Sequence, residues 1–161
     1  MAQLMDTHFN QGLPANLSGA TGEQALLSHG FKALQIAVSA WTAEALKLTM
    51  PASVFSRSTE CHNQDKVSMG TIAARDCIRI LELTEQVAVA VLLAVVQGVE
   101  LRGNLETLSP ALQNTVKDLR VYSPFLKADR ALEAELRQCL KLTSKQHWDL
   151  YNTSYPCDAP K

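Results

Sequence analysis

Apolar side chains recur at helical spacing in two long stretches of this chain, residues 23–50 and 67–102. In the first stretch they fall every three or four residues, which places them on one side of a helix. Pro51 follows it, and the residue before a proline is displaced from helical dihedral angles. The second stretch contains neither glycine nor proline between Thr71 and Gln97, so we expect one uninterrupted helix there.

The two halves of the long helix differ in polarity. Charged residues interrupt the first half, whereas the segment VAVAVLLAVVQGV, from Val87 to Val99, is apolar on every face. Its length falls short of the roughly 20 residues that a membrane span requires, so we expect burial inside protein and no membrane partner. A β-strand is an alternative for the valine-rich part, but the lack of turn residues on either side favours a helix.

Shorter helices and loops complete the chain. They are, in order, a short helix and loop (1–21), a connecting loop (51–66), two shorter helices (109–142) and a tail (143–161). Ser109 followed by Pro110 predicts a helix start, with serine as the cap and proline at the first helical position. Asp129 is the expected cap of the next helix. We therefore predict a single all-α module over residues 1–161, of the class built from bundles of long helices.

The length of the long helix bears on what surrounds it. About 36 residues at 1.5 Å each span about 54 Å, whereas a compact domain of this size has a diameter of about 40 Å. This chain alone is too small to cover such a helix along its apolar half. We expect it to pack against helices of other chains or of other parts of a larger protein, as in a homo-oligomer.

Composition narrows the possible function classes. Hydrophobic residues make up 47% and charged residues 19% of the chain, as in folded globular proteins. The net charge of −1 leaves no basic surplus to neutralise phosphates, so we do not expect nucleic-acid binding. The four cysteines and four histidines are scattered, and no secretory signal is visible. This pattern favours a reduced, cytoplasmic protein without a structural metal site.

A polar segment, STECHNQDKVSMG at residues 58–70, stands at the start of the long apolar-periodic stretch. If the helix begins a little before Val67, then Glu60, Asn63 and Gln64 are spaced i, i+3 and i+4 and share one face. A carboxylate and two amides on one face can hold an amino acid by its ammonium and polar groups. The sequence therefore predicts a candidate site at these three residues.

Three other interpretations compete with a binding site. Ser58, Thr59 and Asp65 are good cap residues, so the segment would serve only to begin a helix. A di-iron site is disfavoured because helical bundles use Glu-x-x-His, whereas Glu60 and His62 are two residues apart. Nucleophilic catalysis by Cys61 with His62 is disfavoured because adjacent side chains on a helix point apart.

The segment STECHNQDKVSMGTIAARD resembles the S-x-E-x-H-N-Q-D-x-x-S-x-G stretch of the aromatic amino acid ammonia-lyases and aminomutases. Other stretches resemble further elements of that family in the same order. They are GLPANLSG (its Leu-Pro loop), HGFKALQIAVSAWTAEALKL (its glutamine-bearing helix), MPASV (its Pro-Ala-Ser element) and AARDCIRILELTEQVAVAVLLAVVQGVELR (its long bundle helix). The resemblance covers residues 3–103 and implies the C-terminal part of an ammonia-lyase-like helical fold. The polar segment is nearest to that of the bacterial tyrosine and phenylalanine aminomutases.

The resemblance also implies an activity and roles for three residues. Enzymes of this family eliminate ammonia from an aromatic amino acid, or move its amino group from the α to the β carbon. By resemblance, Glu60 and Gln64 are catalytic residues, with Glu60 near the substrate's amino group, and Asn63 helps to place the substrate. Gln64 matches a position that carries glutamine in phenylalanine and tyrosine enzymes and glutamate in histidine ammonia-lyases. Phenylalanine or tyrosine is therefore favoured over histidine, whereas lyase versus aminomutase stays open.

One expected element is missing from the sequence. The family forms its electrophile, a methylidene-imidazolone, from an Ala-Ser-Gly tripeptide that does not occur here. The expectation is that this group and the carboxylate-binding residues lie in an N-terminal portion, in the same or another chain. The chain alone should then be inactive, and the complete enzyme a homotetramer. The alternative is a non-catalytic helical assembly protein derived from the same fold.

Overall fold

The computed structural model describes residues 1–145, which contain helices and no strand. The α-helices are α1 (Ala2–Met5), α2 (Lys32–Lys47), α3 (Gly70–Leu101), α4 (Pro110–Tyr122) and α5 (Glu133–Ser144). Short 3₁₀ turns lie between them: η1 (Ala15–Leu17), η2 (Gly22–Leu26), η3 (Ala52–Phe55), η4 (Glu60–His62) and η5 (Leu105–Thr107). The predicted all-α class is confirmed, and residues 146–161 of the predicted tail lie outside the described residues.

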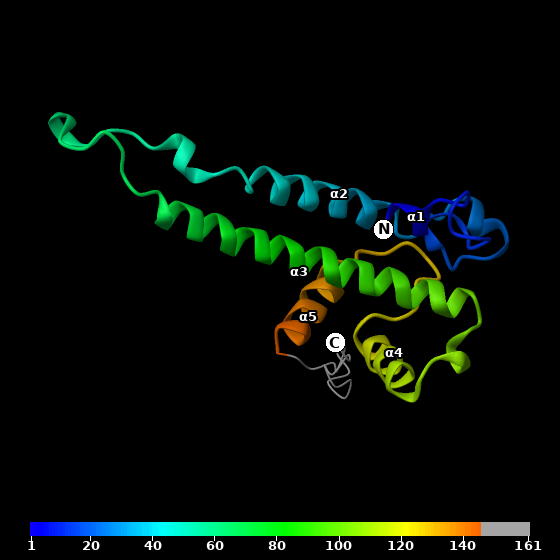
Figure 1. Cartoon of the computed structure of the whole chain (residues 1–161). Coiled ribbons are helices and arrows are strands. Elements are labelled where there is room, and N and C mark those ends of the chain that lie inside the picture. The colour runs from blue at the N-terminus through cyan, green and yellow to red at the C-terminus, as the bar shows by residue number, and fades with distance from the viewer. Residues whose placement is uncertain (146–161) are drawn as a thin grey trace, which may run out of the picture.

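A hairpin of two long antiparallel helices organises the chain (Figure 1). Helices α2 and α3 run side by side, and the loop between them, residues 48–69, forms the far tip of the hairpin. Helices α4 and α5 lie on the other side of α3, near its C-terminal half, and α5 contacts it. The N-terminal segment packs near the base of the hairpin, so the core lies at the end opposite the tip loop.

Helix α3 begins at Gly70 rather than at residue 67 and is about 48 Å long at 1.5 Å per residue. The expectation that its apolar second half lacks cover is wrong for most residues, because the chain buries Val89, Leu93 and Val96. The uncovered apolar side chains lie mainly on the first half instead, where Ile78 is 59% and Leu81 is 58% exposed. The N-terminal segment, α4 and α5 gather near the C-terminal half of α3, whereas α2 and η3 lie beside its first half.

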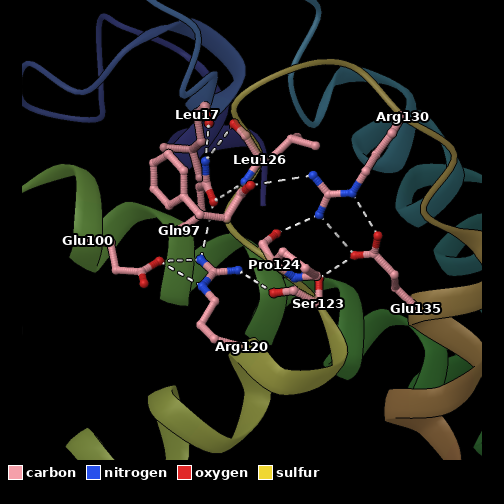
Figure 2. A network of polar contacts seen from close by, with 10 residues as sticks. Leu17, Gln97, Glu100, Arg120, Ser123, Pro124, Leu126, Arg130 and Glu135 are labelled. Carbon is pink, nitrogen blue, oxygen red and sulfur yellow. Dashed lines mark hydrogen bonds and ion pairs between the residues drawn. The ribbon is translucent and has the colours of Figure 1, made fainter.

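A buried amide on α3 connects this helix to η1, to α4 and to the segment that follows α4 (Figure 2). Gln97 of α3 is 0% exposed. Its Nε2 donates to the carbonyl oxygens of Leu17 (3.3 Å) and Leu126 (3.2 Å). Its Oε1 accepts from the backbone N–H of Leu126 (3.1 Å) and from Nη2 of Arg120 (3.2 Å). Both donors and the acceptor are satisfied, which removes the cost of burying this polar group.

Ion pairs extend this network to α4 and α5 (Figure 2). Arg120 Nε donates to Oε2 of Glu100 on α3 over 2.8 Å, and its Nη1 donates to the carbonyl oxygen of Ser123 over 2.9 Å. The Ser123 hydroxyl donates to Oε2 of Glu135, whose Oε1 accepts from Nε of Arg130 over 2.7 Å. A continuous set of polar contacts therefore joins α3, α4 and α5.

The buried amide also bears on the membrane question. By length and composition α3 as a whole is long and apolar enough to cross a membrane. The sequence argument, which counted only the run Val87–Val99, underestimated the length of this apolar segment. The central helix of a protein core can have the same length and apolar composition. The bonds from Gln97 to backbone of other segments favour the core interpretation of this half of α3.

The start of α2 differs from the prediction of one helix over residues 23–50. The stretch is broken at Gly30, which has φ +52°, a left-handed value that other residues rarely adopt. A Cβ at this position would lie 2.5 Å from the carbonyl oxygen of Asn16. The 3₁₀ turn η2 ends before this close approach, at Leu26, and α2 begins after it, at Lys32.

Asp129 does not cap the helix that follows it, which corrects the sequence prediction. Helix α5 begins at Glu133 without a side-chain cap. The Asp129 carboxylate instead accepts hydrogen bonds at the start of α2, from the backbone N–H groups of His29 (2.8 Å) and Gly30 (2.9 Å) and from the hydroxyl of Ser28 (2.9 Å). The predicted start of α4 is confirmed, because the Ser109 hydroxyl accepts from its first turn.

Replacing Gln97 with leucine should destabilise the fold strongly. The apolar side chain removes four hydrogen bonds and takes away the partners of the Leu17 carbonyl oxygen and the Leu126 N–H, so we expect the free energy of unfolding to fall by about 3 kcal/mol. Urea unfolding followed by circular dichroism measures this. Gln138→Leu, at an exposed position of α5, is the matched control and should change it little. A loss of less than about 1 kcal/mol for Gln97→Leu would contradict the proposed weight of the buried amide.

Asp129 should make stability depend on pH at the acidic end. Hydrogen bonding, first from the backbone N–H of His29, lowers the pKa of Asp129 from 3.8 to about 2. A folded-state pKa below the unfolded value stabilises the fold above about pH 4, and this contribution is lost as the pH falls from about 4 to about 2. Thermal unfolding should therefore show a lower midpoint for Asp129→Asn than for the parent at pH 7, and nearly equal midpoints at pH 2. The same difference at both pH values, or a similar pattern for Asp65→Asn in the tip loop, would count against this role.

Candidate functional site

The three predicted site residues lie together in the tip loop of the α2–α3 hairpin, far from the buried core (Figure 1). Glu60 is the first residue of η4, and Asn63 directly follows this turn. Gln64 comes next, before the chain extends toward α3. All three side chains are exposed in this chain, so their polar groups are open to a partner or a ligand.

The local backbone differs from the helical geometry assumed from the sequence. Cys61 and His62 have φ values of 49° and 59°, in the left-handed region, so they cannot continue a right-handed helix. The chain turns there, and α3 does not begin until Gly70. The premise that Glu60, Asn63 and Gln64 share one face of an α-helix is therefore wrong.

The three residues instead belong to a short loop whose two ends are joined by hydrogen bonds. The Thr59 N–H donates to the carbonyl oxygen of Gln64 over 3.0 Å, and the Gln64 N–H donates to Oγ1 of Thr59 over 2.9 Å. Inside this closure the Asn63 N–H donates to the carbonyl oxygen of Glu60 over 2.9 Å. The three residues thus occupy a six-residue loop, 59–64, whose ends are joined.

A second closure lies at the base of the tip loop. The buried hydroxyl of Ser56 donates to the carbonyl oxygen of Val67 over 2.7 Å and accepts from its N–H over 2.9 Å. Lys66 Nζ adds a longer bond to the carbonyl oxygen of Ser56, at 3.4 Å. Sequence reasoning missed Ser56 altogether, and the only available signal was a serine close to the motif.

The capping interpretation of the segment does not hold for α3. Its N-cap is Met69, whose side chain makes no cap hydrogen bond, and at the helix start the Ser68 hydroxyl accepts from the N–H of Gly70 over 3.3 Å. Thr59, which the pattern also suits to capping, uses its hydroxyl to accept the N–H of Gln64. The predicted cap residues of this segment therefore lie too far from Gly70 in the chain to begin the long helix, and only Ser68 bonds there.

An apolar groove of about 420 Å³ lies beside the tip loop, between the end of α2 and the start of α3. Its lining includes Met50, Phe55, Met69 and Ile72, but none of the three predicted site residues. The described residues also include no group of three histidine, cysteine or acidic side chains placed to hold a metal ion. Within this chain the site consists of an exposed carboxylate and two exposed amides.

Comparison with known proteins gives a consistent family assignment. The sequence model described as "Aromatic amino acid lyase" matches residues 1–121. The chain is 39% identical over 139 residues to a tyrosine ammonia-lyase of Cereibacter sphaeroides, with 84% of this chain and 26% of that protein covered. It is 34% identical over 141 residues to a histidine ammonia-lyase of Desulfotalea psychrophila, with 88% and 26% covered.

A solved structure shows the same arrangement of helices. The crystal structure of a tyrosine aminomutase from Streptomyces globisporus superposes with a TM-score of 0.80 at 29% sequence identity. The superposition covers 91% of this chain and 27% of that one. The chain therefore spans about a quarter of the length of the relatives it matches.

Proposed function

The chain belongs to the aromatic amino acid lyase family, and from that premise we propose that it supplies one wall of a composite active site. The complete enzyme would be an aromatic amino acid ammonia-lyase or 2,3-aminomutase. The observation that carries the proposal is the closed loop at residues 59–64, which holds Glu60, Asn63 and Gln64 at the exposed tip of a long helical hairpin.

Each of the three side chains suits a part of an amino acid substrate. The Glu60 carboxylate can bind the substrate ammonium and can accept a proton. The amide of Asn63 both donates and accepts hydrogen bonds, so it can orient the substrate. Gln64 presents a neutral amide, which tolerates an apolar or phenolic ring better than a carboxylate does. This favours phenylalanine or tyrosine over histidine as substrate.

The electrophile of the reaction has to come from elsewhere. The family's methylidene-imidazolone activates the substrate for loss of ammonia and forms from Ala-Ser-Gly. This chain does not fit that requirement, because its Ala52 and Ser53 are followed by Val54. We therefore propose that an N-terminal portion, in the same or another polypeptide, carries this group, and that residues 1–161 alone are inactive.

The surface of the hairpin supports a larger assembly. Ile72, Ile78 and Leu81 leave apolar surface exposed along the first half of α3, and exposed apolar surface of this kind is typical of interfaces. We propose that the remainder of the enzyme covers it, within a homotetramer. The exposed free thiols of Cys61 and Cys77 are typical of a reducing compartment, so we propose a cytoplasmic location.

Glu60→Ala and Gln64→Ala should each abolish most of the activity of the complete enzyme. A hybrid in which this chain replaces the matching quarter of the Cereibacter sphaeroides tyrosine ammonia-lyase provides that enzyme, and coumarate absorbance reports turnover of tyrosine. We expect turnover by the hybrid, none by residues 1–161 alone, and a loss of at least about tenfold in kcat/KM for each variant, or about 1.4 kcal/mol.

The matched controls for this experiment are Glu106→Ala and Gln138→Ala, which remove the same side chains outside the tip loop. Both should retain the activity of the parent hybrid. A folded, oligomeric hybrid without activity would contradict the proposed function. Equal activity of parent, Glu60→Ala and Gln64→Ala hybrids would favour the non-catalytic assembly role for this chain.

Gln64→Glu should shift substrate preference toward histidine. A carboxylate at this position can pair with an imidazole N–H and is disfavoured beside an apolar or phenolic ring. Initial rates of the hybrid with tyrosine, phenylalanine and histidine should show the ratio of kcat/KM for histidine to that for tyrosine rising at least about tenfold. An unchanged ratio would mean that Gln64 does not face the ring of the substrate.

A further inference from the structure

Both polar groups of the Gln64 backbone are bonded to a single residue. Its N–H donates to Oγ1 of Thr59 over 2.9 Å, and its carbonyl oxygen accepts from the N–H of Thr59 over 3.0 Å. The second of these bonds joins backbone atoms, so any residue other than proline at position 59 could make it. The first requires a hydroxyl at residue 59, so only this bond depends on the side chain.

This closure is one of two that follow each other along the tip loop. Ser56 with Val67 forms the outer one and Thr59 with Gln64 the inner one, and in both a hydroxyl accepts the N–H of the partner. The outer hydroxyl is buried and fixes the base of the loop. The inner one lies directly beside the residues assigned to the substrate.

The segment between the inner contacts needs such a constraint. Cys61 and His62 are both in the left-handed region, which is disfavoured for residues with a side chain and persists where neighbouring contacts hold it. The Thr59 carbonyl oxygen accepts from the N–H of His62 over 3.2 Å. Thr59 therefore contacts both the turn, at His62, and Gln64 beyond the turn.

We propose that Thr59 is a positioning residue that sets the direction of the Gln64 side chain relative to Glu60. Glu60 is bonded covalently to Thr59, and the Gln64 backbone is held by the Thr59 hydroxyl and N–H, so these contacts restrain the backbone positions from which the carboxylate and the amide extend. The catalytic consequence rests on the proposed function of the loop, whereas the hydrogen bond itself does not. Misplacing a substrate-binding group by about 1 Å is enough to slow a reaction substantially.

Two substitutions separate the hydroxyl from the shape of the side chain. Thr59→Val keeps the volume and removes the acceptor, and Thr59→Ser keeps the acceptor. Thr115→Val is the matched control, because the Thr115 hydroxyl also makes a single backbone bond, to Ala111 of α4, far from the tip loop.

Amide hydrogen exchange of the 161-residue chain, followed by NMR, tests the contact directly. Thr59→Val should speed exchange at Gln64 by at least about threefold, and Thr59→Ser and Thr115→Val should leave the rate near that of the parent. Equal exchange at Gln64 in the parent and Thr59→Val would overturn the inference.

Kinetics of the hybrid enzyme test the positioning role. Thr59→Val should lower kcat about tenfold with a smaller change in KM and an unchanged melting temperature, and Thr59→Ser should restore kcat. If Thr59→Val turns over like the parent while Gln64→Ala does not, the positioning role is wrong and the proposed function stands. If the folded parent hybrid is inactive, the proposed function is wrong, and the exchange rates at Gln64 decide whether the contact exists.

Discussion

The amide of Gln97 is buried where α3, η1 and the segment after α4 meet, and each of its polar atoms is bonded there. An amide in an apolar interior is costly unless it is paired. Its partners are backbone groups of Leu17 and Leu126 and the side chain of Arg120, so they come from segments far apart in the sequence. Only an arrangement that places all of them around α3 satisfies the amide, and the packing at the base of the hairpin follows from this constraint.

The rest of the architecture depends on how that base is fixed. Because the covering segments gather around the C-terminal half of α3, the other half extends with α2 as a projecting arm (Figure 1). The arm ends in a loop that is closed twice by hydroxyl groups, at Ser56 and Thr59. A loop constrained in this way, on a stiff support, holds polar groups at a defined distance from the core, which is what a shared active site requires.

Much of the helical structure could be predicted from sequence, because burial periodicity is a local signal. The start of α2 could not, since it depends on Gly30 approaching another segment and on Asp129, which is 99 residues farther along the chain. Motif resemblance identified the candidate site residues, but it did not predict their geometry. Nothing in the residue types of Cys61 and His62 signals two successive left-handed conformations, and a helical spacing was assumed in their place. The buried hydrogen bonds of Gln97 had one sequence signal, a single polar residue within an apolar run.

The most direct test of the account is the structure of the hybrid enzyme with a bound, unreactive tyrosine analogue, determined by cryo-electron microscopy. The account predicts that Glu60, Asn63 and Gln64 face one cavity containing the ligand, with the electrophile contributed by polypeptide outside this chain. A ligand bound elsewhere, with the tip loop pointing into solvent, would contradict it.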